Sequence, residues 1–96
     1  MKKTKQMEEM LLEHFRKTPI VEAVCQKAGI SRMTLSRWKR DDTEFSKKVD
    51  AALLEGRLLV NDLAENQLIA AIQERNMTAI ALWLRHNHRA YRERID

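Results

Sequence analysis

Between Ser31 and Arg40 the sequence gathers arginine and lysine side chains around two large apolar residues, Leu35 and Trp38. The three-residue spacing of these two places them on one face of a short helix. If that face packs inward, the polar and cationic side chains point outward together. Such a face offers hydrogen bonds and positive charge to an anionic partner, and arginine can donate two parallel hydrogen bonds to a guanine in the major groove of DNA. The alternative is an ordinary solvated surface helix.

The outward positions divide by the contact that each one suits. Residues at the start and middle of the helix are expected to reach base edges; these are Ser31, Arg32, Met33, Ser36 and Arg37. Among them, Met33 suits the apolar methyl group of thymine. Cations at the end of the helix and at the start of the chain are better placed for phosphates, which add affinity without sequence information. They are Lys39, Arg40, Lys2, Lys3 and Lys5.

Three short helices are predicted to build the region around these side chains. The apolar spacing places them over residues 4–16, 19–28 and 32–40. Thr18 is expected to cap the second helix, because proline is favoured at the first helical position that follows a cap. Gly29 is expected to end that helix in the left-handed conformation, and Ser31 to cap the third.

The second and third predicted helices match the helix-turn-helix pattern, whose second helix enters the major groove of DNA. The two helices of this motif cross closely, so a small residue is needed near the crossing, and Cys25 supplies it. Apolar side chains must line the inner sides of both helices and the turn; these are Val24, Ala28, Ile30, Leu35 and Trp38.

A single long helix is predicted from Thr43 to about Arg75, where the sequence has no proline. Apolar or small residues recur there in steps of four and three, the repeat of a helix that packs lengthwise against another helix. The stripe contains Phe45, Val49, Ala52, Gly56, Leu59, Leu63, Asn66 and Ala70, and a second one contains Leu54, Leu58, Leu68, Ile69 and Ile72. We expect oligomerisation through Phe45, Val49, Ala52, Gly56, Leu59, Leu63, Ile69 and Ile72.

A last helix is predicted after a turn at Asn76, running to about His88 and folding back on the long helix as an antiparallel hairpin. The expected protein is therefore all-α. We expect residues 1–42 to form a three-helix, helix-turn-helix head that binds DNA, and residues 43–96 to form an oligomerisation hairpin with a basic tail.

Composition and charge agree with an intracellular polyanion-binding protein. The chain has 96 residues, of which 44% are apolar and 33% charged, with one cysteine. A single cysteine excludes an internal disulfide framework, and no apolar run reaches the ~20 residues that cross a bilayer. The net charge is +6 in residues 1–40, −5 in residues 41–74 and +3 in residues 75–96. Only the head is thus expected to meet a polyanion, in the cytoplasm.

No catalytic or metal-binding arrangement stands out. His86 and His88 are two residues apart, so on a helix they point in nearly opposite directions, and no cysteine or carboxylate completes a metal site with them or with His14. No phosphate-cradling glycine loop or catalytic triad appears. We expect a protein that is not an enzyme and that needs no cofactor, metal or small-molecule substrate.

Two segments, GISRMTLSRWKRDDTEF and NMTAIALWLRHNHRAYRER, joined by the long helix, resemble the phage terminase small subunit and its helix-turn-helix relatives. The resemblance covers about residues 18–94. It implies that the head binds the packaging-initiation site of viral DNA, through Ser31, Arg32, Met33, Ser36, Arg37 and Arg40. It also implies that the long helix and hairpin assemble copies of the chain, and that a partner is the terminase large subunit, an ATP-driven motor. The resemblance also implies that this protein is located in the cytoplasm of the host cell.

Three other readings of the sequence stay open. The same head would serve a transcriptional regulator that binds a palindrome as a dimer. It would also serve as the DNA-recognition part of a transposase or recombinase. The remaining hypothesis is a helical protein-interaction module whose basic helix is simply solvated.

Overall fold

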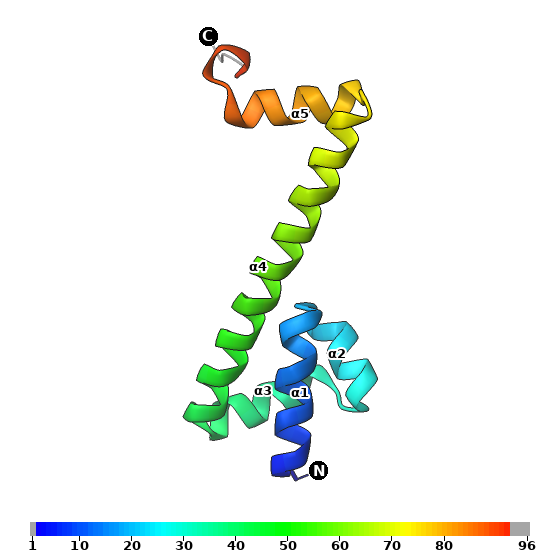
Figure 1. Ribbon diagram of the computed structural model, residues 1–96. Helices are drawn as coiled ribbons and strands as arrows, with labels where there is room; N and C mark the ends of the chain where they lie inside the picture. Colours follow the sequence, from blue (N-terminus) through cyan, green and yellow to red (C-terminus); the bar gives the residue numbers. More distant parts are fainter. Residues whose placement is uncertain (1, 93–96) are drawn as a thin grey trace. The chain divides into compact units, whose positions relative to one another are not determined.

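In the computed structural model, residues 2–92 are described, and every regular element among them is a helix (Figure 1). The elements are α1 (Lys5–Lys17), α2 (Val21–Ala28), α3 (Arg32–Asp41), α4 (Thr43–Gln73), α5 (Met77–Asn87) and the short 3-10 helix η1 (Arg89–Tyr91). The prediction of an all-α chain is confirmed. By its internal packing the chain divides into two compact units, Met1–Asn61 and Asp62–Asp96.

The helix starts of the first unit follow from polar side chains that cap free backbone N–H groups. Thr4 Oγ1 accepts a hydrogen bond from Met7 N at 3.1 Å, and Ser31 Oγ accepts one from Thr34 N at 3.0 Å. Asp42 Oδ1 accepts from Phe45 N at 3.1 Å at the start of α4. Such caps each contribute about 1 kcal/mol to helix stability.

The predicted start of the second helix is wrong. Thr18 closes α1 instead, because its N–H donates to the His14 carbonyl at 2.8 Å, and a residue before proline is held in extended conformation. The α2 helix begins at Val21, and Ile20 at its N-cap makes no side-chain capping bond. The other end is as predicted: Gly29 ends α2 with φ of 75°, in the left-handed region.

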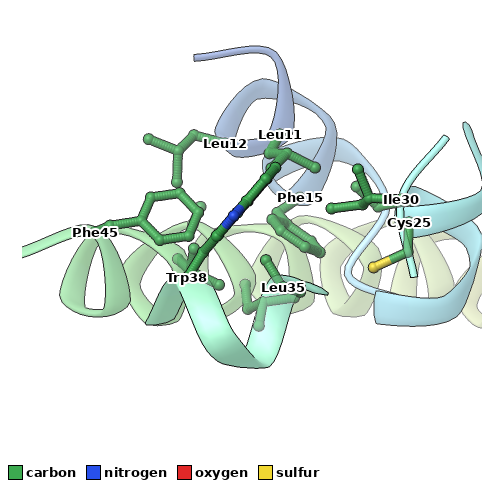
Figure 2. Packing of buried hydrophobic residues seen from close by; sticks show 12 residues of the cluster. Leu11, Leu12, Phe15, Cys25, Ile30, Leu35, Trp38 and Phe45 are labelled. Atoms are coloured by element: carbon green, nitrogen blue, oxygen red, sulfur yellow. The ribbon is translucent and has the colours of Figure 1, made fainter. Parts of the chain in front are cut away.

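One closed hydrophobic core holds the first unit together. Buried side chains of α1, α2, α3 and the beginning of α4 belong to one cluster. Figure 2 shows Phe15, Trp38 and Phe45 among them, close together. The buried members of this cluster are Leu11, Leu12, Phe15, Val24, Cys25, Ile30, Leu35, Trp38, Phe45, Val49, Ala52 and Leu53. The side chains expected to line the inner sides of the second and third helices are among them, except Ala28, which is half-buried at the edge.

Gly56 allows α4 to approach α1 more closely than any side chain would permit. A Cβ atom built on Gly56 would collide with the carbonyl oxygen of Phe15, and it would lie 3.2 Å from both the Arg16 carbonyl oxygen and Pro19 Cβ. At position 56 the fold needs a residue without a side chain, whereas at position 29 it needs glycine for the left-handed backbone conformation.

The second unit holds the end of α4, then α5 and η1. The turn between the helices places Arg75 at a φ of 65°, and the Asn76 side chain caps α5 by accepting from Ala79 N at 3.0 Å. The antiparallel hairpin is not confirmed. Of the α5 side chains only Ala79 is buried, and Trp83 keeps 39% of its surface exposed.

Candidate nucleic-acid interface

The α3 helix is sharply divided into a buried and an exposed side. Leu35 and Trp38 are buried in the core, whereas Met33 is 83% exposed, the largest exposed fraction of any large apolar side chain among residues 2–92. The residues expected to face outward at the start and middle of the helix are all exposed: Ser31, Arg32, Met33, Ser36 and Arg37. Arg40 is exposed as well. The predicted separation of inner and outer residues on this helix is therefore confirmed.

Ser31 has a structural task beside its expected contact with bases. Its hydroxyl caps the Thr34 N–H and also lies 3.0 Å from the Thr34 hydroxyl. Both bonds stabilise the first turn of α3, which carries Arg32 and Met33. Ser31 thus positions the exposed face.

Most of the α3 cations have a carboxylate partner in the same unit. Arg32 Nε lies 3.8 Å from Glu22 Oε2, Lys39 Nζ lies 3.1 Å from Asp50 Oδ1, and Arg40 Nε lies 3.6 Å from Asp41 Oδ1. The Arg32 and Arg40 pairs are largely exposed to solvent, whereas the Lys39 side chain is 31% exposed. The two exposed pairs contribute little to stability, so their arginines can exchange the carboxylate for another anion. Within residues 2–92, Arg37 is the one cation of α3 for which no such pair is found.

Lys3 does not belong with the expected phosphate-binding lysines. Its Nζ donates to Asp42 Oδ2 at 2.9 Å and to Glu8 Oε2 at 3.3 Å, and lies 4.5 Å from the centroid of the Phe45 ring. Only 16% of its side chain is exposed. The bond to Asp42 raises the pKa of Lys3 and lowers that of Asp42. Lys3 fastens the start of the chain to the α3–α4 corner, whereas the neighbouring Lys2 and Lys5 are exposed.

Only part of the predicted oligomerisation surface is exposed. Phe45, Val49, Ala52 and Gly56 are buried in the core of the first unit, so their own chain already covers them and they cannot face another subunit. Leu59, Leu63 and Ile69 are exposed and Ile72 is half-buried. Further exposed apolar side chains, which the expected surface left out, are Leu54, Leu58, Val60, Met77, Leu82 and Trp83. Their part in assembly stays a prediction.

Three acidic residues matter for the site but have no signal in the local sequence. Glu22 and Asp50 pair with cations of α3 from other helices, and Asp42 holds Lys3 across 39 positions of the chain. The negative middle segment of the sequence indicated acidic residues but not which cations they would meet.

The described residues contain no cluster of three or more histidine, cysteine and carboxylate side chains that could hold a metal ion. Cys25 lies inside the core, where burial raises the pKa of its thiol and disfavours the reactive thiolate. Nor is any helix in this part of the chain long and apolar enough to cross a membrane.

Comparison of the chain with protein-family models, with curated proteins and with solved structures finds no match.

Proposed function

We propose that the chain is a sequence-recognising DNA-binding protein whose α3 helix enters the major groove. The observation that carries this proposal is the exposed side of α3, where Arg32, Arg37 and Arg40 surround Met33 on a helix fixed from beneath by Leu35 and Trp38. A helix anchored in the core by two buried side chains and carrying three exposed arginines suits base-edge and phosphate contacts at once. In this proposal α2, Gly29 and α3 act as the helix-turn-helix, and the left-handed Gly29 that ends α2 supports this assignment.

The finer proposal is that the chain serves as the small subunit of a phage genome-packaging terminase, bound to the packaging-initiation site as an oligomer. It rests on the resemblance of the two sequence segments and on the exposed apolar side chains of α4 and α5. Apolar side chains left in water favour association with further copies. A terminase large subunit would then be the second protein partner.

The test of DNA binding uses fluorescence anisotropy with labelled duplexes over a range of salt concentrations. We expect log affinity to fall linearly with log salt, with a slope of about −0.9 for each phosphate neutralised. Arg37→Ala should cost about 1–3 kcal/mol on a preferred duplex and relax the choice of base at one position.

Arg57→Ala is the matched control, because Arg57 is an exposed arginine of α4 in the same unit and the substitution removes the same charge. If both variants bind every duplex alike, α3 is not the reading helix. Absence of salt-dependent binding to any duplex would instead favour the helical protein-interaction module.

Native mass spectrometry at near-physiological salt tests the packaging role. A closed assembly of many copies is the expected result. A plain dimer would favour the transcriptional regulator, with two α3 helices about one DNA turn apart.

A further inference from the structure

The Met33 side chain contributes almost no burial of apolar surface to the stability of the free protein. It is 83% exposed in the first turn of α3, and the side chains next to it on that side, Arg32, Ser36 and Arg37, are polar or charged. Because an exposed methionine buries almost no surface, the core does not require it. Its flexible thioether chain can however follow the shape of a partner surface.

The only apolar group that a pyrimidine offers in the major groove is the methyl group on C5, carried by thymine and by 5-methylcytosine. Methionine has no hydrogen to donate, so the hydrogen-bonding edges of the bases offer it little. Of the groups on the groove floor, the C5 methyl is thus the one that Met33 can recognise.

Arg37 lies one helical turn after Met33 and so shares its side of α3. Among the described residues no carboxylate pairs with it, in contrast to Arg32, Lys39 and Arg40. Its guanidinium is therefore the α3 cation that needs no exchange of partners before it meets a guanine. Four residues of helix span about 6 Å, close to two base steps.

We propose that Met33 is a specificity-determining residue that reads the C5 methyl group of a pyrimidine, about two base pairs from a guanine read by Arg37. This inference rests on the proposed DNA binding and adds the chemistry of the base that is recognised.

The experiment begins with selection of preferred duplexes from a randomised library by the parent protein. Each thymine of the enriched duplex is then replaced singly by uracil, which removes only the methyl group. We expect one or two positions at which the parent loses about fourfold in affinity, the effect of one buried methyl group. Cytosine at such a position should bind less tightly than 5-methylcytosine.

Met33→Ala should bind the thymine and uracil duplexes equally well, while keeping the salt dependence of the parent. The matched control is Ile20→Ala, which shortens an exposed aliphatic side chain of the same unit that belongs neither to the exposed side of α3 nor to the apolar side chains of α4, and it should keep the full sensitivity to the methyl group.

Two results separate the failure of this inference from the failure of DNA binding. If the parent binds duplexes in a salt-dependent way but never distinguishes thymine from uracil, Met33 does not read a methyl group and the proposed function stands. If no duplex is bound at all, both proposals are overturned. If Met33→Ala forms a smaller assembly in native mass spectrometry but still distinguishes thymine from uracil, Met33 lies at a contact between proteins and the inference is wrong.

Discussion

The two units of the chain reach different degrees of burial with similar local structure. Both are helical, and both have polar side chains that cap helix starts, Ser31 in the first and Asn76 in the second. Yet side chains of four helices form one hydrophobic core in the first unit, whereas in the second unit Ala79 is the only buried residue of α5. Capping and helix propensity are enough to set where helices begin and end, but they do not supply a core. We therefore expect most of the free energy of folding to come from the first unit. The exposed apolar side chains of the second unit are expected to become buried only when another protein binds.

The strongest way to break this comparison is to truncate one large aromatic side chain in each unit. Phe15→Ala should lower the free energy of unfolding by about 3–5 kcal/mol, because Phe15 is fully buried and leaves a cavity. Trp83→Ala should lower it by less than about 1 kcal/mol, since Trp83 is partly in water already. Urea denaturation followed by circular dichroism measures both. Equal losses would mean that the second unit contributes as much packing energy as the first.

A smaller effect is expected at Gly56, where the test is whether the substitution lowers or raises the stability of the protein. Gly56→Ala should destabilise the protein by about 1–3 kcal/mol, because the new methyl group collides with the Phe15 carbonyl oxygen. This is opposite to the helix propensity, by which alanine is better than glycine by about 1 kcal/mol. Thermal unfolding gives the measurement.

The matched control for Gly56→Ala is Asn61→Ala, at an exposed position of the same helix, which should leave the melting temperature unchanged or raise it slightly. A higher melting temperature for Gly56→Ala would show that α1 and α4 do not approach as closely as described.

The smallest effect concerns the fastening of Lys3 to Asp42, and it depends on pH. The Lys3 hydrogen bond lowers the Asp42 pKa below its ordinary value of 3.8, so the unfolded chain binds this proton more readily than the native one. The stability from this contact is complete above that value and is lost as pH falls through the lower native pKa.

Asp42→Asn should therefore lose less stability than the parent on acidification below 3.8, with denaturation midpoints as the readout. Lys3→Gln removes the same contact from the other side and should flatten the acid dependence in part, because the Phe45 N–H still binds Asp42. Parallel acid profiles for all three proteins would contradict the contact.

Local signals in the sequence predicted the helices well. The apolar spacing, Ser31 and Gly29 gave α3 its start and α2 its end, because caps and left-handed turns depend on a few neighbouring residues. Thr18 was misassigned for the same reason: a threonine before proline suits both the end of one helix and the start of the next. Nothing in the local sequence decides between them.

The partners of each helix face could not be predicted in the same way. The repeat through Phe45 and Leu63 marks one apolar side of α4, but periodicity does not say which residues it will meet. The first turns of α4 meet α1 and α3, whereas Leu63 stays exposed. Lys3 shows the same limit for charge, since its carboxylate partner Asp42 is far away in the chain.

The two tryptophans of the sequence fall one to each unit, Trp38 in the core at 6% exposure and Trp83 in α5 at 39%. Indole emission shifts to longer wavelength as its surroundings become more polar, so the two residues supply separate optical reporters. A Trp83→Phe protein reports on melting of the core through Trp38 alone. A Trp38→Phe protein tests, through Trp83 emission alone and without any attached dye, whether another protein binds at α5.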